Sequence, residues 1–198
     1  MKRPTAQLVL SAYAQGIFPM AHPEEDYRIY WYAPDPRAII PLDGLIVSRR
    51  LRQSVRQAIY EIRVNTAFNE VIAQCAAPRE IEAETWISEG LTAVFGELHR
   101  LGFAHSIEAW RDDCLVGGLY GVGIGGFFAG ESMFFRETNA SKLCLVHLVE
   151  RMRARGFSLL DVQFMTAHLR SLGAVEIPRS DYESQLVEAI GRPCVFAE

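Results

Sequence analysis

The chain has 198 residues and a formal net charge of −4, with 49% hydrophobic and 22% charged residues. Such a chain can bury one substantial core, which excludes disordered, fibrous and coiled-coil classes, and its negative charge argues against a protein that coats nucleic acid. Glycine or charge interrupts the apolar runs well before the roughly 20 residues of a membrane span, so we expect no membrane partner.

The first segment, MKRPTAQLVLSAYAQG, is basic and partly apolar. Because Gln7, Tyr13 and Gln15 interrupt its apolar stretch, we interpret it as a helix over residues 5–15 and not as an export signal, and we expect a cytoplasmic protein. The four cysteines form no CxxC pair and the five histidines no HExxH motif. We therefore expect no metal site, no disulfide framework and no cofactor.

Residues 1–45 differ from the rest in composition and predict a small N-terminal lobe, with the main domain at 46–198. This first part holds six of the nine prolines and an aromatic run that ends at Trp31 and Tyr32. Proline fixes φ and lacks an N–H, so we expect irregular structure after the first helix, made of short extended pieces and turns.

From Ser48 the pattern is regular. Ser48 predicts the cap of a helix through about Tyr60. Alternation and helical spacing then predict a strand at 61–66 and helices at 68–75 and 91–101, the second of which follows Ser88. A three-stranded antiparallel meander is predicted between residues 104 and 135, and after it a helix from Asn139 or Ser141 to about Arg155. The remaining predicted elements are a strand at 157–164, a short helix at 168–173 and a strand at 174–177. Ser180 and Glu183 predict a capping box for the last helix, and residues 192–198 an edge strand.

This order predicts an α+β fold in which helices pack on a twisted, largely antiparallel sheet. The same order occurs in the acyltransferase superfamily typified by acetyl-CoA-dependent N-acetyltransferases, so we expect a GNAT-like domain. The order of elements alone does not give a function.

Gly121, Gly123 and Gly126 match the GxGxxG spacing of dinucleotide-binding loops. That fingerprint requires a helix after the glycines, whereas FFAG predicts a strand. We interpret these glycines instead as places of close approach in a sheet, as in a cleft between splayed strands.

Three polar residues inside apolar strands are candidate site residues: Glu131, Asp161 and Gln163. Buried carboxylates are rare unless paired or functional, but Glu131 fits the polar face of a half-buried strand equally well. Asp161 and Gln163 share one face of their strand because side chains alternate. They form either a structural hydrogen-bonded pair or, as we favour, a pair that faces a ligand.

Aromatic and basic residues outside the apolar pattern have two interpretations each. Trp86 and the pair Trp31–Tyr32 either cover a core edge or stack on an unpaired base. Two arginine clusters are more typical of solvated helix faces, but local contact with phosphate is the alternative; they contain Arg49, Arg50, Arg52 and Arg56, and Arg151, Arg153 and Arg155.

Ten motifs, taken in order, resemble those of bacterial leucyl/phenylalanyl-tRNA–protein transferases. They are YAQGIFPM, YWYAPDPRAIIPL, CAAPRE…TWI, LHRLGFAHSIEAW, LVGGLYG, GESMF, NASK, DVQ, HLRSLGA and IPR, from about Tyr13 to about Leu186. The resemblance implies a small N-terminal domain joined to a GNAT-like domain. It implies an enzyme that transfers Leu or Phe from the 3′ end of charged tRNA to the N-terminal Arg or Lys of an acceptor protein, creating an N-degron for protein degradation.

The resemblance also implies roles for individual residues. Asp161 and Gln163 would meet the incoming amine, and Glu131 would complete the catalytic group. Our own hypothesis for the mechanism is that Asp161, through Gln163 or a water, orients the amine and accepts its proton. Glu131, Leu119 and Phe128 would line the apolar pocket that binds the transferred side chain. Trp86 and Tyr32 would bind the terminal adenosine of the tRNA.

The chain departs from the family pattern at several points. Phe135 follows GESMF where a small polar residue is expected, Leu119 stands where Met is frequent, DVQ replaces a form with a small central residue, and we expect a trimmed N-terminal domain.

Two rival functions remain. An acyl-CoA N-acetyltransferase needs a glycine-containing turn where this chain has RETNASK, and a non-catalytic tRNA-binding module would not require the three polar residues to converge.

Overall fold

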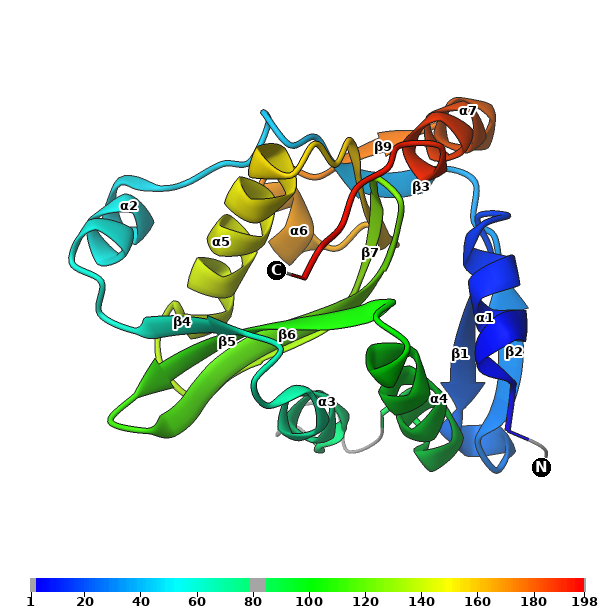
Figure 1. The fold of residues 1–198 in the computed structure, drawn as a ribbon, viewed down its shortest axis with the longest axis horizontal. Coiled ribbons are helices and arrows are strands. Elements are labelled where there is room, and N and C mark those ends of the chain that lie inside the picture. Colours follow the sequence, from blue (N-terminus) through cyan, green and yellow to red (C-terminus); the bar gives the residue numbers. More distant parts are fainter. Residues whose placement is uncertain (1–2, 79–84, 198) are drawn as a thin grey trace.

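The computed structural model describes residues 3–78 and 85–197. In this part of the chain, seven strands form one mixed sheet (Figure 1), in the spatial order β4 (Glu61–Val64), β5 (Ala104–Arg111), β6 (Cys114–Ile124), β7 (Phe127–Phe135), β8 (Leu159–Gln163), β3 (Arg37–Ile40) and β9 (Val175–Ile177). Neighbouring strands are antiparallel, except that β7 and β8 are parallel. The predicted α+β fold, with helices packed on a largely antiparallel sheet, is confirmed.

Apolar side chains form two core clusters, one on each face of the sheet. The first cluster takes its helical residues from α1 (Ala6–Tyr13), α3 (Phe68–Ala76), α4 (Glu89–Arg100) and α7 (Arg179–Ile190). The second lies under α2 (Arg49–Arg56), α5 (Ala140–Ala154) and the segment around α6 (Ala167–Ser171). Figure 1 shows α3 and α4 on one side of β5 and β6, and α5 on the other.

Local capping signals place most helix ends as predicted. The side-chain oxygens of Ser48 and Ser88 accept hydrogen bonds from the first turns of α2 and α4, and α5 begins directly after Asn139. The predicted capping box at Ser180 is wrong. The N-cap position is Pro178, two residues before Ser180, and helix α7 begins at Arg179 without a side-chain cap.

The short extended pieces and turns predicted after the first helix are confirmed, but they are regular strands and not irregular structure. Strands β1 (Phe18–His22) and β2 (Arg28–Tyr32) form an antiparallel hairpin, with a short 3₁₀ turn, η1 (Pro23–Glu25), between them. Strand β3 joins the main sheet between β8 and β9. Its partners lie more than a hundred residues later, so no local pattern reveals the pairing. The boundary between the lobe at 1–45 and the domain at 46–198 stays a prediction.

The predicted edge strand at 192–198 is wrong for the described residues 192–197, which contain no strand. Phe196 instead buries its ring in the second core cluster. A single large apolar side chain held by a core fixes this segment without any ladder of backbone hydrogen bonds.

Glu108 of β5 supplies the cap that α3 lacks locally, because Ala67, before the helix, has no side-chain acceptor. Its buried carboxylate accepts hydrogen bonds from the backbone N–H groups of Thr66 and Ala67 at 2.9 Å each, from the hydroxyls of Thr66 and Ser106, and from the indole N–H of Trp110 at 3.1 Å. A negative charge there complements the unpaired N–H groups of a helix start. Glu108 thus ties α3 to the sheet.

We expect Glu108→Ala to lower the free energy of unfolding by about 3 kcal/mol or more, because several buried donors lose their acceptor together. Urea denaturation of the purified protein measures the change. Glu150→Ala is the matched control, since its side chain is 60% exposed, and it should stay within about 0.5 kcal/mol of wild type. A loss below about 1 kcal/mol in Glu108→Ala would contradict the capping role.

Candidate functional site

The site begins where β7 and β8 separate. Their parallel pairing ends at Ala129 opposite Asp161. Just beyond, Glu131 and Gln163 face each other across the widening gap, where Gln163 Nε2 donates a hydrogen bond to Glu131 Oε1 at 3.1 Å. The two side chains therefore bridge β7 and β8 just beyond the point where the pairing of these strands ends.

A bulge in β7 directs Glu131 into this gap. Tyr120 of β6 pairs with Ser132, and the next residue, Gly121, pairs with Gly130, so Glu131 has no partner on β6. Such an extra residue is released from the ladder and its side chain is re-aimed. Strict alternation from sequence could not show this.

Gln163 occupies a strained backbone position at the end of β8. Its φ is 57°, a left-handed conformation that costs energy for a residue other than glycine and is found preferentially at functional sites. The backbone N–H of Gln163 donates to Asp161 Oδ1 at 2.9 Å. Asp161 therefore holds the conformation that turns Gln163 toward Glu131.

Asp161 is fully buried and bound on all sides by protein groups. Arg37 Nε donates to Oδ1 at 2.9 Å and Arg37 Nη2 to Oδ2 at 2.7 Å, and the hydroxyl of Tyr182 donates to Oδ2 at 2.8 Å. Arg37 is 1% exposed, and its Nη1 donates to the carbonyl of Gly16 at 2.9 Å. Two buried charges are stable only with such complete hydrogen bonding.

The ion pair with Asp161 stabilises the charged guanidinium of Arg37. Burial lowers the pKa of Arg37, but the hydrogen bond and charge of Asp161 outweigh it and raise the pKa above its ordinary value. Asp161 thus reaches the gap through Gln163 and not by its own carboxylate. Sequence reasoning missed Arg37 and Tyr182; the signal for Arg37 was an arginine directly before the apolar AII strand, where an unpaired charge is not tolerated.

Glu131 lies among buried phenols. The hydroxyls of Tyr13 and Tyr120 are both buried, and that of Tyr120 has no hydrogen-bond partner among the described residues. Burial raises the pKa of Glu131 to about 8; the charge of Asp161 adds to the rise, while the Tyr13 hydroxyl and Arg37 oppose it. Burial and the charge of Glu131 raise the pKa of Tyr13 well above its ordinary value. The Tyr13 hydroxyl interacts with Glu131, so the buried Tyr120 hydroxyl beside a carboxyl of this pKa is the unsatisfied group that marks this place as a candidate site.

Tyr32 and Trp86 approach β1 from its two edges. Tyr32, on β2, packs against Phe18 with ring centroids 6.0 Å apart and against Phe164, the residue after Gln163, at 6.2 Å. On the other edge, the carbonyl of Trp86 accepts a hydrogen bond from Ala21 N at 3.2 Å. Both rings are partly buried against the first core cluster. Only Tyr32 is connected to the Glu131–Gln163 gap by these contacts.

Leu119 and Phe128 lie on the α5 side of the sheet, in the second core cluster, and are 4% and 0% exposed. Glu131 instead has Tyr13 and Tyr120 of the first cluster as neighbours. The gap between β7 and β8 is where the two faces of the sheet meet. The structure thus brings Glu131, Asp161 and Gln163 together, and their catalytic roles stay predictions.

The glycine-rich spacing of β6 does not open a helix. Gly121 and Gly123 lie within β6, and Gly126 precedes β7, so a strand follows the GxGxxG spacing. Throughout residues 3–78 and 85–197, no group of three His, Cys, Asp or Glu side chains is arranged to hold a metal ion. None of the helices there is long and apolar enough to cross a membrane.

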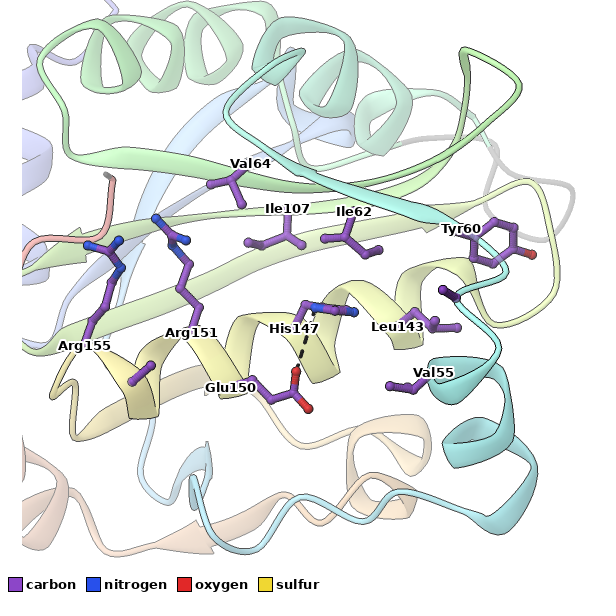
Figure 2. A pocket seen from close by; sticks show the side chains of 12 residues that line it. Val55, Tyr60, Ile62, Val64, Ile107, Leu143, His147, Glu150, Arg151 and Arg155 are labelled. Atoms are coloured by element: carbon purple, nitrogen blue, oxygen red, sulfur yellow. Dashed lines mark ion pairs between the residues drawn. The ribbon is translucent and has the colours of Figure 1, made fainter.

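A second cavity, of about 710 Å³, lies between α5, β4 and β5, beside the end of α2 (Figure 2). Its walls are mainly apolar, and its polar groups already have partners. His147 Nδ1 lies 3.8 Å from Glu150 Oε2, and Arg151 and Arg155 donate to backbone carbonyls near the C-terminus. The cavity shares no lining residue with the Glu131–Gln163 gap.

The sequence matches the model of a family described as leucyl/phenylalanyl-tRNA protein transferase over residues 39–187, and that of its N-terminal domain over residues 3–35. The chain is 53% identical to a leucyl/phenylalanyl-tRNA–protein transferase of Herpetosiphon aurantiacus, over 98% of this chain and 99% of the relative. Identity to that of Rhodospirillum rubrum is 50%, over 94% and 87%. A ribosomal-protein-alanine N-acetyltransferase from Brucella melitensis biovar Abortus 2308 is 13% identical, with a TM-score of 0.40 over 57% of this chain and 84% of that one.

Glu131→Gln should remove a pH dependence of stability that the wild-type protein shows. The folded-state pKa of Glu131 is about 8, whereas an unfolded glutamate titrates at about 4.3, so between these values the folded state binds the extra proton. The associated stabilisation is complete below about pH 4 and is lost as the pH rises toward 8. Urea unfolding of the wild type and of Glu131→Gln at about pH 5.5 and about pH 8.5 measures how the free energy of unfolding changes with pH in each protein. Equal pH slopes in the two proteins would show that Glu131 titrates normally.

Proposed function

Since the chain belongs to the leucyl/phenylalanyl-tRNA–protein transferase family, we propose that the gap between β7 and β8 is its aminoacyl-transfer site. The chain is an aminoacyltransferase whose substrates are aminoacyl-tRNA and protein. The donor is Leu-tRNA or Phe-tRNA, the acceptor is an N-terminal Arg or Lys, and the product carries an N-degron. The convergence of Glu131 and Gln163 at the strand gap, beside the unsatisfied hydroxyl of Tyr120, supports this assignment.

The aminoacyl ester is already activated, so the site mainly has to align two substrates, which supplies several kcal/mol. The α-amine has a pKa of about 7.7–8.0. The pKa of Glu131, at about 8, lies close to it, so proton exchange between them costs little. In this mechanism Gln163 orients the amine and Glu131 accepts its proton. The amine nitrogen bonds to the ester carbonyl carbon, the bond to the ribose oxygen breaks, and the proton passes to that oxygen.

Asp161 then has a positioning role. From the sequence we expect Asp161 to orient the amine and accept its proton, acting through Gln163 or a water. Its burial and its two hydrogen bonds with Arg37 favour the route through Gln163, whose backbone it holds. As a carboxylate it also contributes negative charge below the gap, which favours a cationic acceptor.

The surroundings of the gap suit a basic acceptor N-terminus. Phe164, next to Gln163, is 43% exposed and packs edge-on against Tyr32, which gives a cation aromatic rings to lie on. Beyond Tyr32, the ring of His22 bonds to the Tyr32 hydroxyl and, at 2.8 Å, to the carboxylate of Glu24. Aromatic faces with carboxylates behind them attract Arg or Lys and repel acidic N-termini.

The donor side is served by apolar and stacking groups. Leu119 and Phe128 are the proposed lining of the pocket for the Leu or Phe side chain, where a polar side chain would lose hydrogen bonds on entry. Trp86 and Tyr32 are the proposed stacking partners of the terminal adenosine. Acetyl-CoA is disfavoured because the turn into α5 contains no glycine, and Asn139 there takes the positive φ of 67°.

Helix α2 offers a surface for the tRNA backbone. Its four arginines, Arg49, Arg50, Arg52 and Arg56, are exposed, and none of the salt bridges found among the described residues includes them. A row of arginines without acidic partners attracts phosphates even on a protein of negative net charge. Salt screens the more distant negative charges, so the local positive charge determines the attraction.

The purified protein should transfer labelled Leu from Leu-tRNA to a peptide that begins with Arg, and should transfer nothing from labelled acetyl-CoA to the same peptide. A peptide that begins with Glu is the matched acceptor control. Acetylation without transfer from tRNA would establish the rival acetyltransferase. Binding of tRNA with neither reaction would establish the non-catalytic module.

The double substitution Arg50→Gln, Arg52→Gln should raise the KM for Leu-tRNA severalfold at about 0.15 M salt and leave kcat unchanged. The slope of log KM against log salt should fall by about 1 for each arginine–phosphate pair that the substitutions remove. Arg100→Gln, which removes an exposed arginine from α4, is the control and should change neither quantity. An unchanged salt slope in the double variant would place the tRNA elsewhere.

A further inference from the structure

The hydroxyl of Tyr120 is a buried donor that the core leaves without an acceptor. Its side chain is 0% exposed, and the hydroxyl has no hydrogen-bond partner among the described residues. Phe68 and Phe95 meet the ring edge-on, with centroids 5.9 and 5.5 Å away, and hold it in place. A buried hydroxyl without a partner weakens the folded state, and phenylalanine would fill the same space without that cost. The hydroxyl therefore points to a task other than packing.

The bulge of β7 brings Glu131 to this hydroxyl. Tyr120 of β6 pairs with Ser132, and Glu131 is the extra residue beside that pair, so two residues of β7 oppose Tyr120. Tyr13 of α1 interacts with both Glu131 and Tyr120, which places the three side chains on one face of the sheet. Glu131 is partly exposed, whereas Tyr120 is not. A substrate in the gap can thus meet the carboxyl but not the phenol behind it.

Tyr120 stays a hydrogen-bond donor over the whole neutral range. Burial, and after it the charge of Glu131, raise the pKa of Tyr120 well above its ordinary value, so the phenol keeps its proton. The hydroxyl hydrogen is free to rotate about the bond to oxygen. A donor stabilises a carboxylate more than a carboxylic acid, because a hydrogen bond to a charged oxygen is stronger. The hydroxyl therefore gains a strong acceptor only when Glu131 loses its proton.

We propose that Tyr120 is a positioning residue that turns its hydroxyl toward Glu131 when this carboxyl is ionised, and so favours the charged form that accepts the proton of the amine. The inference rests on the proposed function, in which Glu131 is that acceptor. No bond of Tyr120 forms or breaks in the reaction. The amine proton passes to the Glu131 carboxylate and from there to the ribose oxygen that leaves, while the phenol only donates.

The substitution Tyr120→Phe isolates this hydroxyl, because it keeps the ring and the packing. The other titratable and charged groups that face Glu131 or Tyr120 from neighbouring elements all remain; they are Tyr13 on α1, Arg37 on β3, Cys75 on α3 and Asp161 on β8. A change in the pH dependence of the variant therefore reports the hydroxyl alone.

The first measurement is kcat of the wild type and of Tyr120→Phe, with Leu-tRNA and an Arg-initiated peptide, between about pH 6 and about pH 9. The amine titrates equally in both reactions, so the ratio of the two kcat values shows only the protein's own group. We expect kcat of the variant to be about tenfold lower than wild type at about pH 6.5 and to approach it at about pH 9, because Glu131 without its donor ionises at higher pH. The KM for Leu-tRNA should not change.

The second measurement is urea unfolding, which needs no activity. At about pH 5.5, where Glu131 is protonated, the urea midpoint of Tyr120→Phe should equal or exceed that of the wild type. At about pH 8.5 it should lie below, because the folded wild type then uses the hydrogen bond to the carboxylate. A phenol that serves only packing would give the same difference at both pH values.

Tyr60→Phe is the matched control, since Tyr60 is also buried, at 5% exposed, but its hydroxyl donates to the carbonyl of Thr138 at 2.9 Å. This variant should lower the urea midpoint at both pH values and keep the wild-type pH profile of kcat. An active wild type whose kcat ratio to Tyr120→Phe is constant across the pH range would overturn the inference and leave the proposed function standing. A wild type that transfers no Leu would overturn both.

Discussion

The buried ion pair between Arg37 and Asp161 is the interaction on which the rest of the site depends. It joins β3, from the first part of the chain, to β8, from the last, and its two charges are almost completely removed from water. Such a pair is stable only when every donor and acceptor is matched, and Tyr182, Gly16 and the Gln163 backbone complete the set. Loss of either partner would leave an uncompensated charge in the core.

The geometry of the gap follows from three local irregularities. The parallel ladder of β7 and β8 stops at Asp161, β7 bulges at Glu131, and Gln163 takes a left-handed backbone. Each irregularity costs energy, and each is held in place by its surroundings: the bulge by the glycines of β6 that oppose it, and Gln163 by Asp161. Three irregularities of the sheet thus lie close together around Glu131 and Gln163, the residues of the proposed site.

Desolvation then sets the chemistry of the gap. Burial raises the pKa of Glu131 to about 8, close to that of a peptide amine, while Arg37 and Tyr182 occupy the carboxyl oxygens of Asp161 beneath it. Two neighbouring carboxyl groups thus have different tasks because their partners differ. The aromatic cluster of the hairpin lies beside the gap, and the apolar α5 face lies on the opposite side of the sheet.

The sequence by itself determined the elements with strong local signals: the meander, the capped starts of α2 and α4, and the choice of Glu131, Asp161 and Gln163 as polar residues in apolar strands. Periodicity and capping act over a few residues, so local patterns record them. Only the tertiary structure decided which distant residues pair, such as Arg37 with Asp161, which lie 124 residues apart in the sequence. It placed β3 in the main sheet, replaced a predicted edge strand by the buried ring of Phe196, and turned Asp161 inward to protein partners, because burial and partner choice depend on contacts that no local pattern contains.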